Sequence, residues 1–451
     1  MSVRFFPATM GWNKRIDPLE YFACAIYTRG ALYFKGQIDL DRFINAMSES
    51  FLVFDFILST FYRDSNGCFN ASYPPTNNVE QCHLEIEKIS DSIMNMNNIS
   101  FDQLLPTSKT VGPSQLSGFA PDLTNLPMGV LKLTILSDDG FVLGYSMNHS
   151  LFDQASVFYY LKYISQLYTV GKDKINLPRP AVVNSLPMEN KEFTFKNITE
   201  ARQYGDRVPG FTYTPLIENL ASDDKPHPFS LNSLIKLKFD LDEISKIKSQ
   251  VVEYLSTNDI LSGVLFKVYT MTSYLSDEEI FTLRYANNIR KFAKLGEEII
   301  GNLVHQCRME MSVGEIRNQS ILQLALVNRK SVEDIKFDHF RNTLSWYRYM
   351  YDNNEETLNY LGKTSFTSSR ITNWATFDYD SIKFDTCTPI SVKSVNIAQY
   401  GVNTIAFDIE DSKKIFTIPI SVPPDCVPLV KEYGKSTKLF TTEDMDKPKK
   451  K

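Results

Sequence analysis

The chain has 451 residues, of which 43% are hydrophobic and 13% aromatic, so it can bury a large core and is not a disordered protein. Its length predicts two or three domains. The net charge of −5 excludes an overall basic field of the kind that holds nucleic acid.

Cysteine, histidine and apolar patterns exclude several further classes. The six cysteines include no Cys-x-x-Cys pair, and no two of the five histidines stand at metal-ligand spacing, so we expect neither a metal nor a disulfide framework. The densest apolar run, Phe51–Phe54, is far shorter than the ~20 residues of a bilayer span, and Met1–Arg15 has no signal-peptide pattern. We therefore expect a cytoplasmic protein without a membrane span.

The first part of the chain predicts two strands and a helix between them. Strands are expected at Tyr33–Ile38 and, as a buried strand, at Phe54–Arg63. An amphipathic helix is predicted by apolar residues at three- and four-residue spacing: Leu40, Phe43, Ile44 and Met47.

A hairpin followed by a helix is predicted next. Val130–Leu136 and Phe141–Asn148 read as two strands joined by an Asp-Gly turn. A helical stripe then covers Ala155–Leu167. This order places His149 just past the end of a strand and Asp153 at the start of a helix.

The second half repeats the alternation of strands and helices. It begins with a predicted strand at Ile235–Phe239 and a helix at Leu241–Tyr254, and Ser256 or Thr257 is a plausible N-cap for a further helix. The resulting domain prediction has four parts: an N-terminal α/β domain at 1–180, a Pro-, Asn- and Asp-rich crossover at 181–228, a C-terminal α/β domain at 229–440 and a charged, disordered tail at 441–451.

The strongest chemical signal is the spacing His149-x-x-x-Asp153. A histidine at a strand end is a candidate general base near neutral pH, and a nearby carboxylate can fix the local geometry. The spacing alone is weak, because chance often produces it and a surface histidine beside a helix-capping aspartate would look the same. The exposed rim predicted at this strand end favours the chemical interpretation.

With these residues in view, the chain resembles the BAHD-type acyl-CoA-dependent acyltransferases of the chloramphenicol-acetyltransferase-like superfamily, whose signature is His-x-x-x-Asp followed by Gly. The resemblance extends in order along nearly the whole chain. Its further elements are Phe34–Phe43, Thr257–Leu261, Asn288-Ile289-Arg290, Ile300-Gly301-Asn302 and Thr372-Asn373-Trp374.

The chain also departs from the family pattern at three places. Gln154 stands where glycine is usual, and Asn288 replaces an aspartate. The segment Lys383–Pro389 retains only Phe384 and Pro389 of the family's Asp-Phe-Gly-Trp-Gly-Lys-Pro. Since that segment is structural in the family, the departures indicate a divergent member.

The resemblance implies an α/β fold of two similar domains, each a mixed sheet with flanking helices, and a tunnel at their interface. It assigns His149 as the general base that takes the acceptor proton, with no covalent enzyme intermediate. Asp153 is structural support, and Arg290 is its ion-pair partner.

Four further residues take roles from the resemblance alone. Thr372 and Trp374 are candidate donors to the oxyanion of the tetrahedral intermediate. Gly301 and Asn302 are candidates for lining the thioester channel.

The expected partners are acyl-CoA as co-substrate and a small-molecule alcohol or amine, with no permanently bound cofactor, no nucleic acid and a monomeric chain. Two alternatives remain open. One is a condensation-like enzyme that takes its acyl group from a carrier protein, and the other is a non-catalytic small-molecule-binding relative.

Overall fold

The computed structural model describes most of the chain. The described residues are 2–3, 12–16, 27–65, 69–73, 82–93, 99–107, 127–137, 139–184, 186–208, 212–213, 232–353, 358–359, 367–395 and 401–445. Cys24, Cys68 and Asp138 lie outside them, as do residues 185, 209–211 and 214–228 of the predicted crossover.

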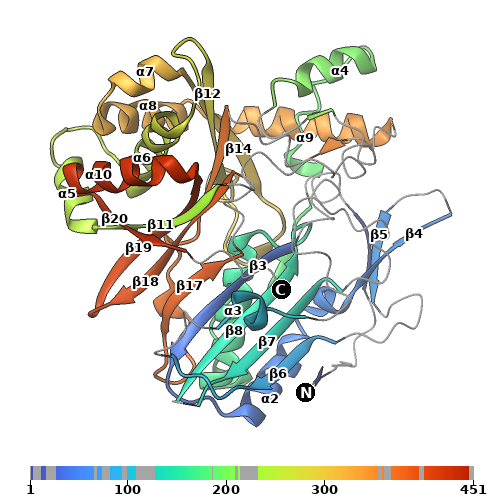
Figure 1. Ribbon diagram of the computed structural model, residues 1–451. Helices are drawn as coiled ribbons and strands as arrows, with labels where there is room; N and C mark the ends of the chain where they lie inside the picture. Colours follow the sequence, from blue (N-terminus) through green and yellow to red (C-terminus); the bar gives the residue numbers. More distant parts are fainter. Residues whose placement is uncertain are drawn as a thin grey trace.

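One mixed β-sheet passes through both halves of the chain (Figure 1). Within the described residues it has 13 strands. Its main path, from one edge to the other, is β1 (Ser2–Val3), β6 (Leu84–Lys88), β7 (Gly129–Ile135), β8 (Gly140–Asn148), β3 (Tyr27–Lys35), β17 (Pro389–Ser394), β18 (Val402–Glu410), β16 (Ser368–Asn373), β12 (Ile280–Asn288) and β14 (Val304–Ser312). A branch leaves β18 through β19 (Lys413–Val422), β11 (Ser233–Phe239) and β20 (Phe440–Asp444).

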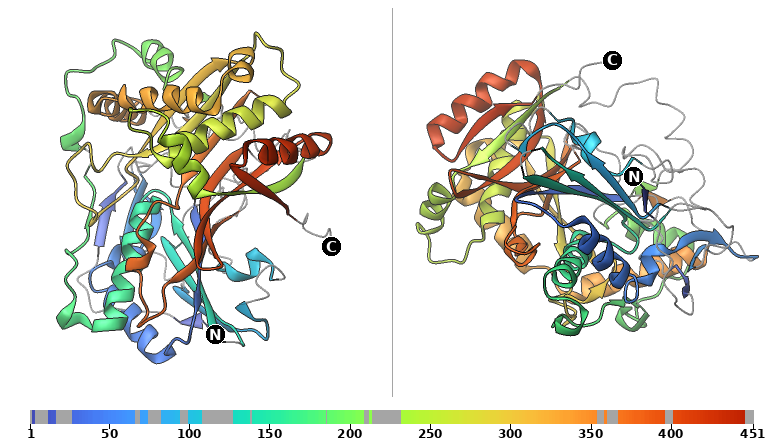
Figure 2. Two further views of the ribbon diagram at one scale, coloured as in Figure 1. Left: turned by 90° about the vertical axis from the view of Figure 1, so that its left-hand side faces the viewer. Right: turned by 90° about the horizontal axis from the view of Figure 1, so that it is seen from below.

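Helices flank this sheet at both ends of the molecule (Figure 2). The helices are α2 (Leu40–Ser50), α3 (Gln154–Val170), α4 (Ile198–Gly205), α5 (Leu241–Lys248), α6 (Thr257–Thr272), α7 (Val313–Asn318), α8 (Ile321–Glu333), α9 (Phe337–Asp352) and α10 (Val427–Thr437). Three small sheets complete the described structure: β2 (Trp12–Arg15) with β5 (Phe69–Tyr73) and β4 (Thr60–Arg63), β9 (Ala181–Val182) with β13 (Ile299–Ile300), and β10 (Thr212–Tyr213) with β15 (Leu358–Asn359).

The two halves interlock because a late strand completes the early part of the sheet. Strand β17 pairs antiparallel with β3, with Val392 opposite Leu32, and on its other side with β18. Leu32, Val392 and Phe407 of β18 are all buried in the same large core. The α/β fold with a mixed sheet and flanking helices, predicted from the sequence, is therefore confirmed.

Most of the predicted helices and strands occur, although their first and last residues are shifted. The apolar residues that predicted a helix lie on its buried face. In α2, Asp39 caps the first turn and the predicted stripe is buried at Phe43 and Met47. The predicted hairpin is β7–β8, and Ser256 is the N-cap of α6, where it forms a capping box with Asp259.

Two predicted elements were wrong in part. Asp55–Leu58 forms a 3-10 turn and only Thr60–Arg63 is a strand, because an apolar run without alternation does not distinguish the two. Helix α5 ends at Lys248 rather than Tyr254, and the apolar side chains of Val252 and Tyr254 are exposed instead of continuing the stripe.

The predicted disordered tail is also wrong at its start. Residues Thr441–Asp444 belong to β20, which pairs with β11. Two charged residues of this strand have ion pairs: Lys236 lies 3.2 Å from Glu443, and Lys431 lies 2.9 Å from Asp444. Residues 446–451 lie outside the described part of the chain.

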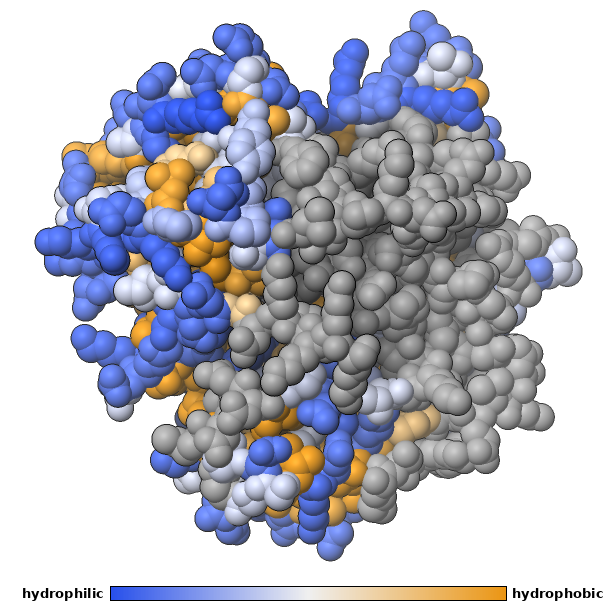
Figure 3. Space-filling view, in the orientation of Figure 1, coloured by the Kyte–Doolittle hydropathy of each residue, from blue (hydrophilic) through white to orange (hydrophobic). Residues whose placement is uncertain are grey.

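No helix in the described part of the chain is long and apolar enough to cross a bilayer. Figure 3 shows hydrophilic residues over most of the described surface on this face, with hydrophobic residues in separate small areas between them.

A glycine in β8 allows the close approach of a neighbouring segment. A Cβ at Gly144 would collide with the backbone carbonyl of Leu104. We expect Gly144→Ala to lower the free energy of unfolding by about 1–3 kcal/mol, because backbone cannot yield as a flexible side chain can. Urea denaturation measures this change.

The control for this variant is Ser146→Ala on the same strand. The Ser146 hydroxyl is buried and has no hydrogen-bond partner within the described residues, so its removal should be neutral or stabilising. Equal stability of Gly144→Ala and wild type would contradict the tight approach of Leu104.

Candidate active site

His149 lies in a turn that Asn148 shapes at the end of β8. The Asn148 side-chain oxygen accepts hydrogen bonds from the backbone N–H of Ser150 at 3.0 Å and from its hydroxyl at 2.6 Å. The Asn148 carbonyl accepts from the backbone N–H of Phe152 at 2.9 Å. From β3, the Thr28 hydroxyl donates to the Phe152 carbonyl at 2.8 Å. The turn is therefore fixed from both sides, as a site for a positioned side chain requires.

The surroundings of His149 favour the neutral form of its imidazole. The residue is partly buried, and its Nδ1 atom is inaccessible to solvent. Burial lowers the pKa of His149 from its usual 6.5, and this effect exceeds the opposing influence of the Asp153 charge. A neutral imidazole can accept a proton, which is the property that a general base needs.

Asp153 and Arg290 form a buried, bidentate ion pair, as predicted. Arg290 Nη1 lies 2.7 Å from Asp153 Oδ2, and Arg290 Nη2 lies 3.0 Å from Asp153 Oδ1. Asp153 is 1% exposed and Arg290 is 4% exposed. Two parallel N–H to carboxylate bonds in a dry interior form a strong, directional contact.

The remaining hydrogen-bonding capacity of this pair is satisfied by neighbouring groups. Asp153 caps helix α3 by accepting from the Ser156 backbone N–H at 2.8 Å, and it accepts from the Leu303 backbone N–H at 3.0 Å. Arg290 also donates to the carbonyls of Ile299 and Gly301. The pair thus joins the start of α3 to the segment between β12 and β14.

This environment keeps Asp153 ionised. Burial alone would raise the pKa of Asp153, but the Arg290 charge and the hydrogen bonds from Arg290 and Ser156 outweigh it, so the pKa is lowered. The ionised carboxylate is thus held by Arg290 at the start of α3, four residues after His149.

Gln154, which replaces the family glycine, has a defined buried place. Its side-chain oxygen accepts from the Tyr145 hydroxyl at 3.1 Å, and its side-chain nitrogen donates to the Tyr379 hydroxyl at 3.3 Å. Tyr145 belongs to β8, four residues before His149, whereas Tyr379 comes from the late part of the chain. A Cβ at Gly30 would meet the Tyr145 hydroxyl, so Gly30 makes room for this side chain.

Trp374 lies next to the strand that carries His149. Its ring centroid is 6.4 Å from that of Tyr145, and its backbone N–H donates to the Ile405 carbonyl at 2.9 Å. Trp374 is 8% exposed and Thr372 is partly buried. The structure therefore brings Trp374, which directly follows β16, next to Tyr145 of β8, four residues before His149.

Gly301 and Asn302 stand beside the ion pair. A Cβ at Gly301 would collide with the side chain of Val183, so the need for glycine here comes from packing against β9 and its continuation. Asn302 is fully buried, and neither atom of its carboxamide has a hydrogen-bond partner within the described residues. A buried amide without a partner is costly, so a bound molecule that reached it would restore lost hydrogen bonds.

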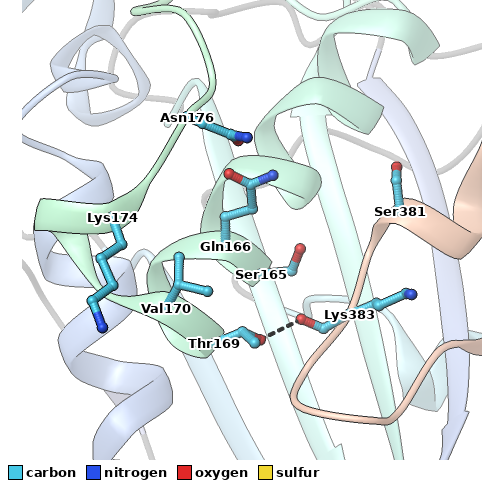
Figure 4. Close-up of a pocket in the computed structure, with 8 residues that line it drawn as sticks. All are labelled: Ser165, Gln166, Thr169, Val170, Lys174, Asn176, Ser381 and Lys383. Carbon is cyan, nitrogen blue, oxygen red and sulfur yellow. Dashed lines mark hydrogen bonds between the residues drawn. The ribbon is translucent and has the colours of Figure 1, made fainter.

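A separate pocket lies at the other end of α3. Its volume is about 250 Å³, and Figure 4 shows its lining side chains, with the Thr169 hydroxyl donating to the Lys383 carbonyl at 2.7 Å. Ser165, its nearest lining residue to the helix start, stands 11 positions after Gln154, which is about 16 Å along a helix. The pocket is therefore distant from the turn that carries His149.

Sequence reasoning missed the groups that complete the site. Ser156, the Leu303 backbone N–H and the Tyr145–Gln154–Tyr379 chain do not belong to any quoted motif. Only the departure at Gln154 marked one of them in the sequence. No group of three or more metal-ligating side chains occurs in the described ranges.

Comparison with protein families identifies the kind of protein to which this arrangement belongs. The model of the Transferase family, the BAHD acyltransferases, matches residues 85–432. The chain belongs to this family. No curated protein matches the chain sequence significantly.

Solved structures of BAHD acyltransferases have the same fold. TRI101 of F. graminearum with ethyl coenzyme A has a TM-score of 0.72 and 15% identity, covering 96% of this chain and 100% of that chain. F. sporotrichioides TRI101 with coenzyme A and T-2 has a TM-score of 0.71 and 15% identity, covering 95% and 99%. Vinorine synthase has a TM-score of 0.64 and 14% identity, covering 98% and 96%. The two-domain BAHD fold is therefore established, and the predicted family is confirmed.

The buried pair makes a direct stability prediction. Asp153→Asn leaves the Arg290 charge without its partner, so we expect the free energy of unfolding to fall by about 3–5 kcal/mol in denaturant titrations at pH 7. Because the folded pKa of Asp153 is lowered, this loss should shrink as the pH falls below the unfolded value of 3.8 and through the folded one.

The matched control is Asp385→Asn. Asp385 pairs with Arg42 at the surface, where both side chains are more than 40% exposed, so less than about 1 kcal/mol should be lost. An unchanged stability of Asp153→Asn would contradict the role of the buried pair.

Proposed function

We propose that this BAHD protein transfers an acyl group from acyl-CoA to a hydroxyl or amine of a small molecule, with His149 as the general base. The observation that carries the proposal is the placement of the partly buried His149 imidazole in a hydrogen-bonded turn, four residues before Asp153 of the buried Asp153–Arg290 pair. The coenzyme A bound in the TRI101 structures supports an acyl-CoA thioester as the donor. The T-2 bound in one of these structures supports a small-molecule acceptor.

The proposed reaction is a direct transfer. His149 takes the proton of the acceptor hydroxyl or amine as that atom attacks the thioester carbonyl carbon. The carbon–sulfur bond then breaks, the acyl group stays on the acceptor, and the imidazolium returns its proton to the leaving thiolate. Atoms and charges balance without a covalent enzyme intermediate.

The remaining site residues have supporting roles in this proposal. The Thr372 hydroxyl and the Trp374 indole N–H donate to the oxyanion of the tetrahedral intermediate, where a preorganised donor is most effective. Asn302, whose buried carboxamide has no hydrogen-bond partner within the described residues, lines the thioester channel, and Gly301 is adjacent to it, packed against Val183. Donor and acceptor would reach His149 from opposite faces of a tunnel between the two domains.

The decisive experiment is a screen of acyl-CoA donors against pooled alcohols and amines, with free thiol release as the readout. His149→Ala should lower the rate by ~10²–10⁴-fold, because it removes the base. The matched control is His339→Ala, which removes an exposed histidine on α9 and should keep full activity. Activity that survives in His149→Ala would refute the mechanism.

The pH dependence of kcat/KM gives a second test. Since burial lowers the pKa of His149 below its usual 6.5, the base should lose its proton below that pH. We expect kcat/KM to rise with pH, to pass its half-maximal value below pH 6.5 and to level off between that midpoint and pH 8. A midpoint well above 6.5 would show that another group controls the rate.

Turnover with free acyl-CoA also separates the two alternatives. A condensation-like enzyme would require the thioester on a carrier protein and would give little thiol release with free acyl-CoA. A binding protein without catalysis would give none with either donor, although it would still bind a small molecule.

A further inference from the structure

Three arginines lie side by side on neighbouring strands at one edge of the sheet. Arg284 of β12 is paired with Arg308 of β14 on one side and with Arg370 of β16 on the other. Residues that are paired in register project from the same face of a sheet. The three guanidinium groups, which we name the arginine row, therefore share one face. Strands β12 and β14 are labelled in Figure 1.

The arginine row does not belong to the packed face of these strands. Leu283, Tyr285 and Ile371 alternate with the arginines and are buried in the large core on the other face. There the Tyr285 hydroxyl lies 2.6 Å from the Ser331 hydroxyl of α8. Helix α8 therefore covers the opposite face, and the row has no part in that packing.

Exposure changes steadily along the arginine row. Arg370 is 6% exposed, Arg284 is partly buried, and Arg308 on the edge strand is exposed. Arg308 has an ion pair with Glu310 at 3.5 Å. By contrast, Arg284 Nε and Nη1 are buried and have no hydrogen-bond partner among the residues that the structure describes.

This arrangement is unfavourable without a ligand. Like charges on directly paired residues repel each other, and a shielded guanidinium without a partner loses hydration that nothing replaces. Consistently, the pKa of Arg284 is lowered, first by burial and then by the Arg308 charge, and these two effects outweigh the opposing charge of Glu310. An anion bound between the arginines would remove both penalties.

The inner end of the arginine row lies next to the candidate oxyanion donor. Thr372 follows Arg370 by two positions on β16, so it projects from the same face about 7 Å further along the strand. Thr404 of β18 is paired with Thr372. Its hydroxyl is buried and has no hydrogen-bond partner in the described residues. The row thus leads from the exposed edge strand to the proposed reaction centre.

We propose that Arg308, Arg284 and Arg370 form a subsite for an anionic group of the substrate. Guanidinium groups bind phosphate and carboxylate oxygens through paired N–H donors, which suits either chemistry. The assignment rests on the proposed function, under which the anion is a phosphate of CoA. A carboxylate on the acyl group or the acceptor is the other source with the same chemistry.

The first test needs no turnover and uses inorganic pyrophosphate as the probe. Thermal unfolding of wild type should shift upward with pyrophosphate, compared with chloride at equal ionic strength. Without pyrophosphate, Arg284→Gln should unfold at a temperature no lower than that of wild type, because the repulsion between like charges is relieved. With pyrophosphate, its unfolding temperature should not shift. Arg207→Gln, which removes an exposed arginine elsewhere, should keep it.

Two results of this test would overturn the proposal. One is a pyrophosphate shift that persists in Arg284→Gln, and the other is the absence of any shift in wild type. If Arg284→Gln fails to fold, Arg308→Gln serves instead, since it changes an exposed side chain, and it should reduce the same shift.

The second test identifies the source of the anion by calorimetry with CoA and with pantetheine. Arg284→Gln should weaken CoA binding about tenfold or more and leave pantetheine binding unchanged if the anion is a phosphate. If CoA binding is unchanged, turnover with malonyl-CoA should fall while turnover with acetyl-CoA does not, which assigns a carboxylate on the acyl group. Unchanged binding and unchanged turnover with both donors overturn the subsite.

Failure of the subsite can be told apart from failure of the proposed function. If wild type shows the pyrophosphate shift but no His149-dependent thiol release, the anion subsite is supported and the proposed acyl transfer is refuted. If wild type shows His149-dependent transfer but no pyrophosphate shift, the proposed function is supported and the subsite is refuted.

Discussion

The ion pair between Asp153 and Arg290 is the interaction on which the candidate site depends. Asp153 starts α3, and Arg290 follows β12, so the pair fixes two elements that lie 137 positions apart in the sequence. Burying two charges is costly unless the geometry is bidentate and every other donor is satisfied. Here both conditions are met, because Ser156, Leu303 and Gly301 supply the remaining hydrogen bonds. The chain is therefore held at Asp153, four residues after His149, while Asn148 and Thr28 hold the turn itself.

A second constraint, the pairing of strands, joins the two halves of the chain in one sheet. Strand β17 is inserted between β3 and β18, so the early strands cannot settle independently of the late ones. The ring contact of Tyr145 with Trp374 adds a second connection close to His149. A site assembled in this way requires the whole chain, since neither half contains the base together with its support and the candidate oxyanion donors.

The sequence was informative where local chemistry decides structure. The hairpin before His149 and the capped helices follow from turn and cap residues, and the family motifs led to the Asp153–Arg290 pair. The pairing of β17 with β3 could not be derived, because nothing local in Pro389–Ser394 specifies a partner more than 350 residues away. The prediction of a disordered tail failed for a related reason: β20 pairs with β11, and nothing local in Phe440–Asp444 specifies that distant partner.

At position 154 the departure from the family motif replaces a glycine by a glutamine that makes buried hydrogen bonds of its own. A glycine at this position would leave the buried hydroxyls of Tyr145 and Tyr379 without the amide that now bridges them. The amide and the two tyrosines therefore form one unit, in which each group satisfies the others. Asp153 makes its own contacts through Arg290 and Ser156, none of which involves the Gln154 side chain. The support of the His149 turn is thus independent of the residue that follows Asp153, and the change from glycine leaves that support intact.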